Sequence, residues 1–209
     1  MAAFPIVVLN GGSSSGKSSI ARALQGLLGP TWMTLGVDDL VRALPGGDQP
    51  LGGELSVEFG QDGSVTVGED FRQAEAAWYQ GLAAIGRAGT GLIIDEVFLG
   101  GKSSQERLAR ALAGLPVLWV GVRCAPEVAG RREQRRTDRV VGMAVSQAER
   151  VHDGVEYDLV VDTTNVPAIE CARAVAARVA QYGAAQCGVT QCGEGRSRWL
   201  AGPEPGRSL

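Results

Sequence analysis

The sequence predicts an α/β fold built on a parallel sheet with helices on both faces, and three observations support this. Short, continuously apolar runs alternate with longer amphipathic stretches along the 209 residues. Continuous apolar strands separated by helices indicate parallel strands that are buried on both faces. A glycine-rich motif of the phosphate-binding type follows the first apolar run. Apolar residues make up 44% of the chain, which suits one compact domain with its own core.

Five apolar runs are expected to form the strands, and amphipathic stretches between them are expected to form the helices. The predicted strands are residues 5–10, 32–37, 91–95, 117–122 and 157–162. The predicted helices are residues 17–28, 69–87, 103–113, 126–136, 140–151 and 167–182. Such sheets bind ligands beyond the carboxyl ends of their strands, so functional side chains are expected there.

One segment departs from this alternation. Residues 55–59 and 65–67 alternate between apolar and polar side chains around an Asp62-Gly63 turn, which predicts an inserted β-hairpin. The hairpin either shapes a substrate pocket or is a plain surface feature. Residues 1–182 are interpreted as a single domain. Residues 183–209 are rich in Gly, Pro, Ser and Arg without apolar periodicity, and are expected to be a mobile tail.

Charge and composition exclude several functional classes. The net charge of −3 provides no broad basic field for nucleic acid. No apolar run reaches the ~20 residues of a membrane span. The N-terminus lacks the basic start of a signal peptide, so the cytoplasm is the expected location. The four cysteines do not form a secreted disulfide framework, and a zinc site among them is disfavoured. The oligomeric state is not indicated.

The glycine-rich motif carries the strongest functional signal. It fits G-x-x-x-x-G-K-[ST] and lies between a predicted strand and a predicted helix. Its glycines let successive backbone N–H groups point at phosphate oxygens, and the helix adds the positive end of its dipole. Lys17 is expected to reach the β- and γ-phosphates of ATP, and Ser18 to bind Mg²⁺. The residues of the motif are Gly11, Gly12, Ser13, Ser14, Ser15, Gly16, Lys17 and Ser18.

This motif is shared by ATPases, GTPases and kinases. The N-K-x-D segment that usually recognises guanine does not occur in the sequence. The chain is also short and lacks the extensions of motor ATPases. Kinases of small molecules or nucleotides therefore remain, and residues 1–182 are interpreted as a single P-loop kinase domain.

Two acidic positions follow predicted strands. Asp38 lies at the end of the second strand, where a carboxylate can accept the proton of an attacking hydroxyl. Alternatively, Asp38 or Asp39 caps a helix that begins at Leu40. Asp95 ends the third strand and is expected to join Ser18 around Mg²⁺, directly or through water. The alternative is a strand-end carboxylate paired with a basic side chain.

An arginine-rich segment follows the fourth strand. On a helix, Arg132, Arg135, Arg136 and Arg139 would share one face. In small kinases a mobile lid brings arginines over the phosphates and stabilises the charge of the transition state. The alternative is a solvated basic face that neighbouring acids partly offset.

Several segments together resemble the chloramphenicol phosphotransferase family. The loop motif is generic, but the segments Asp95-Glu96-Val97-Phe98-Leu99-Gly100-Gly101 and His152-Asp153-Gly154-Val155-Glu156-Tyr157-Asp158 are far more specific. The likeness runs from about residue 5 to about residue 179. The matching segments are residues 9–18, 36–38, 93–101, 118–124, 138–140, 151–158 and 162–164.

The resemblance implies a nucleoside-monophosphate-kinase-like fold with an arginine-bearing lid. It also implies ATP-dependent phosphorylation of a primary hydroxyl on chloramphenicol or a similar small molecule, which is an antibiotic-resistance activity. Asp38 falls where the family has its catalytic base. Arg136 and Arg139 fall on the family's lid arginines, and Arg132 also matches.

The sequence departs from the family pattern in places. Asp39 and Glu96 stand where Ser and Asp are expected, and the chain extends beyond the usual end of the family. These differences leave two alternatives open. One is a kinase of the same fold that acts on a nucleoside, sugar or other metabolite. The other is a non-catalytic, nucleotide-dependent regulatory module.

Overall fold

The computed structural model describes residues 6–45, 57–59, 65–135 and 142–187. Its main feature is a five-stranded sheet in the order β2-β5-β1-β6-β7, in which every neighbouring pair of strands is parallel. The predicted parallel sheet is therefore confirmed. The strands are β1 (Ile6–Asn10), β2 (Met33–Gly36), β5 (Leu92–Glu96), β6 (Val117–Arg123) and β7 (Leu159–Asp162).

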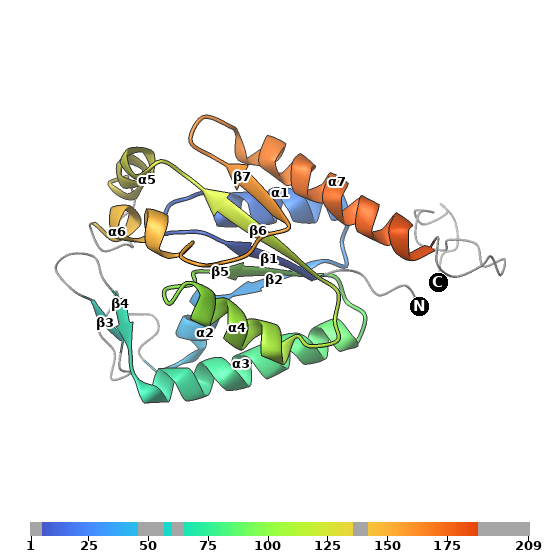
Figure 1. Ribbon diagram of the computed structural model, residues 1–209, viewed down its shortest axis with the longest axis horizontal. Coiled ribbons are helices and arrows are strands. Elements are labelled where there is room, and N and C mark those ends of the chain that lie inside the picture. The colour runs from blue at the N-terminus through green and yellow to red at the C-terminus, as the bar shows by residue number, and fades with distance from the viewer. Residues whose placement is uncertain (1–5, 46–56, 60–64, 136–141, 188–209) are drawn as a thin grey trace, which may run out of the picture.

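Helices cover both faces of the sheet, as the sequence predicts (Figure 1). Helices α1 (Lys17–Leu28) and α7 (Ala168–Cys187) lie against one face, and α3 (Glu69–Arg87) and α4 (Lys102–Ala111) lie against the other. Helix α2 (Val37–Ala43) directly follows β2. Helices α5 (Pro126–Glu133) and α6 (Met143–Arg150) lie beyond the carboxyl ends of the strands.

Alternate side chains of the central strand β1 enter two separate hydrophobic clusters. Val7 and Leu9 pack with side chains of α1 and α7 in the first cluster. Ile6 and Val8 pack with side chains of α3 and α4 in the second. This two-sided burial is why the strand is apolar at every position up to Asn10, and it fixes the sheet between two helical layers.

The predicted hairpin is present. Strands β3 (Val57–Phe59) and β4 (Val65–Val67) pair antiparallel and lead into α3. The Asp62-Gly63 turn lies outside the described residues.

Several helix boundaries differ from the prediction, and three of them bear on the site or the chain end. Helix α2 begins at Val37, so Asp38 lies in its first turn and not at a strand end. Helix α5 ends at Glu133 and not at residue 136 as predicted, so Arg132 lies in its last turn and Arg135 lies beyond it. The side-chain oxygens of Glu133 accept hydrogen bonds from the backbone N–H groups of Gly142 and Ala144, which ties the end of α5 to the start of α6. Helix α7 continues past the predicted end at residue 182.

Among the residues that the structure describes, no helix combines the length and the hydrophobicity that crossing a lipid bilayer requires.

Candidate active site

The glycine-rich loop connects the carboxyl end of β1 to the first turn of α1 and contains two residues with positive φ. Gly16 has φ 92°, and Ser14 has φ 57°, which is uncommon for a residue with a side chain. A Cβ atom on Gly11 would lie 2.4 Å from the carbonyl oxygen of Val122. The motif therefore needs glycine at positions 11 and 16 for separate reasons, close packing at one and backbone conformation at the other.

Buried polar atoms of this loop lack partners within the described part of the chain. The side-chain oxygens of Ser13, Ser14 and Ser15 are buried and have no hydrogen-bond partner there. Lys17 is only 7% exposed, and its Nζ donates a hydrogen bond of 3.0 Å to the carbonyl oxygen of Gly12. Buried polar atoms without partners are costly. A phosphate group bound in the loop would supply oxygen acceptors for them.

Ser18 and Asp95 meet as the sequence predicts. The Ser18 hydroxyl donates a hydrogen bond of 2.7 Å to Oδ2 of Asp95, and Nζ of Lys17 lies 3.9 Å from Oδ1 of the same carboxylate. A hydroxyl and a carboxylate beside a phosphate loop are oxygen ligands of the type that Mg²⁺ prefers, with phosphate and water completing its shell. This donor set fits a magnesium ion.

The two neighbouring acids of α2 have different contacts. Oδ2 of Asp39 accepts a hydrogen bond of 2.8 Å from the backbone N–H of Gly36, and Oδ1 pairs with Arg42. Asp39 is therefore the residue that caps the helix. Gly36 pairs in register with Asp95, so Asp38 lies just beyond the strand next to the proposed metal ligand. Helix capping, which the sequence allowed for either Asp38 or Asp39, is therefore the role of Asp39.

Thr163 supports the phosphate loop from behind. Its hydroxyl donates a hydrogen bond of 2.6 Å to the carbonyl oxygen of Ser15. Arg132 of α5 donates to Thr163 twice, to Oγ1 at 3.2 Å and to the carbonyl oxygen at 2.7 Å. Arg132 is thus held beside the loop by the segment after β7. Arg136 and Arg139 lie outside the described residues.

Helix α6 contacts the loop from the other side. Oε1 of Gln147 accepts a hydrogen bond of 2.8 Å from the backbone N–H of Ser13. A Cβ atom on Gly12 would lie 3.2 Å from the backbone of Gln147, so glycine also permits this close approach. The helix that follows the arginine-rich segment therefore touches the phosphate loop directly.

A polar network anchors the end of β1. Asn10 accepts a hydrogen bond of 2.9 Å from the backbone N–H of Phe98 and donates one of 2.6 Å to the hydroxyl of Tyr157. The Tyr157 hydroxyl lies 2.6 Å from Nδ1 of His152. Burial, followed by the nearby positive charges of Arg123 and Lys17, lowers the pKa of His152 to about 4. His152 is thus neutral at physiological pH, and its contacts are those of a structural residue.

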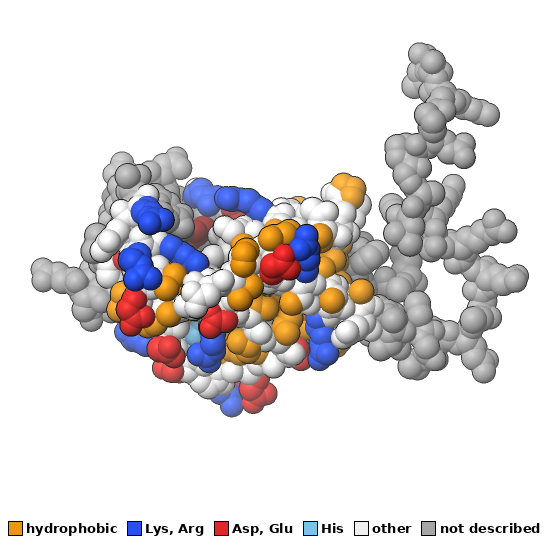
Figure 2. Space-filling model, turned by 90° about the horizontal axis from the view of Figure 1, so that it is seen from above, with side chains coloured by type: hydrophobic (Ala, Val, Ile, Leu, Met, Phe, Trp, Pro, Cys, Tyr) orange, Lys and Arg blue, Asp and Glu red, His pale blue; other side chains and the backbone are white. Residues whose placement is uncertain are grey.

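Basic side chains gather at the end of the molecule that carries α5 and α6. Figure 2 shows them at that end when the molecule is viewed from the α1–α7 side. Arg131 and Arg132 occupy the last turn of α5, and Arg150 occupies the last turn of α6. Of these, Arg132 is the residue whose contacts place it beside the phosphate loop, through Thr163.

An apolar groove of about 410 Å³ lies between α2 and α3. Its lining includes Leu40 of α2 and Leu44, which directly follows that helix. Asp38 precedes Leu40 by two residues, about 200° around the helix, and so projects from the opposite side. We therefore do not assign this groove to the acceptor hydroxyl that Asp38 would deprotonate.

The chain is similar to a known protein family and to two curated relatives. A model of the family described as chloramphenicol phosphotransferase-like protein matches residues 5–180. The chain belongs to this family. Two Mycobacterium tuberculosis proteins (strains CDC 1551 and H37Rv), both provisionally named O-phosphotransferases, are 33% identical over 178 residues, which is 80% of this chain and 79% of the relative.

Solved structures with a fold similar to that of this chain include kinases. A sugar kinase from Janibacter sp. HTCC2649 superposes with a TM-score of 0.60 at 18% identity, covering 86% of this chain and 97% of its own. A gluconokinase from Sinorhizobium meliloti 1021 gives a TM-score of 0.58 at 18% identity, covering 88% and 97%. At these identities the likeness shows the fold, which is that of P-loop kinases.

Sequence reasoning missed the residues that support the loop. Asn10 carried a signal, because a polar residue ends a strand that is otherwise apolar. Thr163 appears in a segment shared with the family, but its role depends on β7 lying beside β6. Gln147 carried no signal, since an isolated glutamine in an amphipathic helix predicts no contact.

Proposed function

We propose that this protein is an ATP-dependent O-phosphotransferase that phosphorylates a primary hydroxyl of chloramphenicol or a similar small molecule. The observation that carries the proposal is the meeting of Lys17, Ser18 and Asp95 at the phosphate loop, beside the β2 end that leads to Asp38. The family match and the kinase fold support the reaction class.

The loop would hold ATP through its backbone N–H groups and Lys17, and Ser18 and Asp95 would hold Mg²⁺. When bound, Mg²⁺ would neutralise charge on the phosphate oxygens. Asp38 would accept the proton of the acceptor hydroxyl as the hydroxyl oxygen attacks the γ-phosphorus in line, while the bond from that phosphorus to the β–γ bridging oxygen breaks and ADP leaves. Little covalent chemistry falls to the protein, so positioning and charge stabilisation carry the rate.

The arginines have different expected roles. Arg132 is held by Thr163 at the back of the loop, which suits a fixed positive charge close to the nucleotide. Arg136 and Arg139 are proposed to close over the phosphates, by their match to the lid arginines of the family. Chloramphenicol resistance would follow if the drug is the acceptor.

The test is ADP release from ATP and Mg²⁺ with and without chloramphenicol, followed by mass spectrometry of the drug. A drug product heavier by one phosphate supports the proposal. Absence of stimulation by chloramphenicol, with stimulation by a nucleoside or sugar, would move the function to another metabolite. Nucleotide binding without turnover of any hydroxyl compound would favour a regulatory module.

A further inference from the structure

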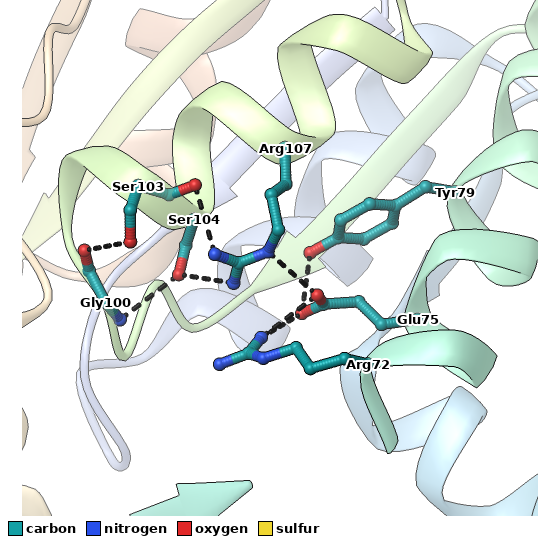
Figure 3. A network of polar contacts seen from close by, with 7 residues as sticks. All are labelled: Arg72, Glu75, Tyr79, Gly100, Ser103, Ser104 and Arg107. Atoms are coloured by element: carbon teal, nitrogen blue, oxygen red, sulfur yellow. Dashed lines mark hydrogen bonds and ion pairs between the residues drawn. The ribbon is translucent and has the colours of Figure 1, made fainter. Parts of the chain in front are cut away.

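A buried glutamate holds two arginines between α3 and α4 (Figure 3). Glu75 is 7% exposed. Its two oxygens accept hydrogen bonds of 2.9 and 3.0 Å from Nη1 of Arg72, and Oε2 accepts one of 2.9 Å from Nε of Arg107. The Tyr79 hydroxyl lies 3.4 Å from Oε1. The carboxylate is thus saturated, and it fixes the orientation of both guanidinium groups.

All three nitrogens of Arg107 are engaged. Beyond the bond from Nε to Glu75, Nη1 donates to the carbonyl oxygen of Ser103 at 3.1 Å, and Nη2 donates to Oγ of Ser104 at 3.0 Å. Ser104 in turn accepts a hydrogen bond from the backbone N–H of Gly100. Arg107 therefore ties α3 to the start of α4, with each of its three side-chain nitrogens bonded to a protein group.

Arg72 differs from Arg107 in this respect. Its only hydrogen bonds with described residues come from Nη1, and none of those residues accepts a hydrogen bond from its Nε or Nη2. The side chain is 33% exposed, and in Figure 3 its second Nη points away from Glu75. Nε and Nη2 lie on one edge of the guanidinium, where two parallel donors match a planar pair of oxygen atoms.

The position of Arg72 agrees with a role in acceptor binding. It lies in the first turn of α3, directly after the β3–β4 hairpin. Its partner Glu75 also binds Arg107 of α4, the helix that follows the carboxyl end of β5. The same end of β5 carries Asp95, and the neighbouring strand β2 leads to Asp38. The fixed guanidinium is thus on the side of the sheet where an acceptor would meet the γ-phosphate.

We propose that the Nε–Nη2 edge of Arg72 binds the acceptor through a planar pair of oxygen atoms, either a carboxylate or a nitro group. Glu75 prepares this site by fixing the guanidinium before the ligand arrives, which reduces the entropy lost on binding. The inference rests on the proposed phosphotransferase function, because it names the chemistry of the acceptor. A second hydroxyl or an apolar ring would not use two parallel donors in this way.

The test compares the wild type with Arg72→Gln, Arg72→Lys and a control, Arg110→Gln, on the exposed end of α4. Binding is measured by calorimetry on protein saturated with a non-hydrolysable ATP analogue and Mg²⁺. The probes form two matched pairs, chloramphenicol with its analogue lacking the nitro group, and gluconate with gluconamide. The first pair tests the nitro group and the second tests the carboxylate.

We expect one oxygen-pair probe to bind the wild type and Arg110→Gln equally, and to bind Arg72→Gln about 10- to 100-fold more weakly. Arg72→Lys should lose most of this affinity, because an ammonium keeps the charge but lacks the two parallel N–H donors of a guanidinium. The matched probe without the oxygen pair should bind all variants alike. Retained affinity for the ATP analogue shows that each variant is folded.

The outcomes separate this inference from the proposed function. Gluconate binding that depends on Arg72, without phosphorylation of chloramphenicol, would support the inference and overturn the proposed acceptor. Phosphorylation of chloramphenicol with the same KM in Arg72→Gln would overturn the inference and leave the function standing. Failure of both oxygen-pair probes to bind the wild type would also overturn the inference.

Discussion

At the scale of single residues, two adjacent carboxylates at the start of α2 have separable roles. Asp39 bonds Gly36 and Arg42 and so caps the helix. Asp38 sits one position earlier, where its backbone follows the strand next to Asp95. Because each position can be neutralised without changing side-chain shape, the pair forms a natural comparison between chemistry and stability.

We expect Asp38→Asn to lower phosphotransfer about 10²- to 10⁴-fold while the affinity for ATP stays unchanged, because only proton removal is lost. Asp39→Asn should keep most of its turnover and lose about 1 kcal/mol of unfolding free energy through weaker capping. Steady-state kinetics and thermal unfolding of both variants check this. Wild-type turnover in Asp38→Asn would remove Asp38 from the mechanism.

Thr163 allows a second prediction at this scale. In Thr163→Val the carbonyl oxygen of Ser15 and one Arg132 donor lose their partner, so the loop is less well ordered for phosphate. We expect ATP to bind about 10-fold more weakly, as measured by calorimetry. Thr163→Ser retains the hydroxyl and should bind ATP like the wild type. Equal loss in both variants would indicate packing, not the hydrogen bond.

At the scale of secondary structure, the elements that burial dictates could be predicted and those that side-chain contacts dictate could not. Strand β1 is apolar at four consecutive positions because both faces are covered, and this pattern is visible in the sequence. The start of α2 is set by the bond between Asp39 and Gly36, and the end of α5 is followed by the Glu133 bonds to α6. Neither contact follows from periodicity.

The same distinction applies to the site. The phosphate loop and the Ser18–Asp95 pair could be predicted, because the motif and the strand end are local in sequence. The contact between Gln147 and Ser13 joins segments that are 134 residues apart, and the contact between Thr163 and Ser15 spans 148. Such contacts depend on strand order, which the motifs do not encode.

His152, in the segment that joins α6 to β7, should make the stability of the fold depend on pH. His152 has its pKa lowered to about 4 by burial, whereas an exposed histidine titrates near 6.5. The unfolded chain therefore binds a proton more readily, so the stability that neutral His152 contributes is present above about pH 6.5 and is lost as the pH falls toward 4.

Replacement of His152 with Asn removes this titration and keeps an acceptor for the Tyr157 hydroxyl. Between pH 7 and pH 4 the wild type should lose about 1–3 kcal/mol more unfolding free energy than His152→Asn. Urea denaturation at a series of pH values measures the difference. Parallel stability profiles of the two proteins would show that His152 does not titrate differently on folding.

At the scale of the whole molecule, one sheet joins two hydrophobic clusters, and the phosphate loop lies between them at the end of the central strand. Helix α1 continues from the loop into the first cluster, so ordering of the loop by a ligand is connected directly to the core. Nucleotide binding should therefore be visible as stabilisation of the entire fold.

ATP with Mg²⁺ at 100 times its Kd is expected to raise the unfolding free energy by about 2.7 kcal/mol. In Ser18→Ala the same ligand concentrations should raise the unfolding free energy by less. The variant should lose only the part of this increase that depends on Mg²⁺. Lys17→Ala should lose most of the gain even with Mg²⁺ present. Thermal unfolding with ATP alone, Mg²⁺ alone and both together provides the measurement and its controls. Identical gains in Ser18→Ala and the wild type would remove Ser18 from the magnesium site.

Strand β2 is at the edge of the sheet and is held by β5 alone, through four residues, although the chain reaches Asp38 through it. A strand paired on one side opens at a lower free energy than the centre of the sheet. Fraying of β2 would carry Asp38 away from Asp95 while the other four strands remain paired. Heating should consequently abolish phosphotransfer before the fold melts, and amide hydrogens of Thr34 to Gly36 should exchange with solvent sooner than those of β1.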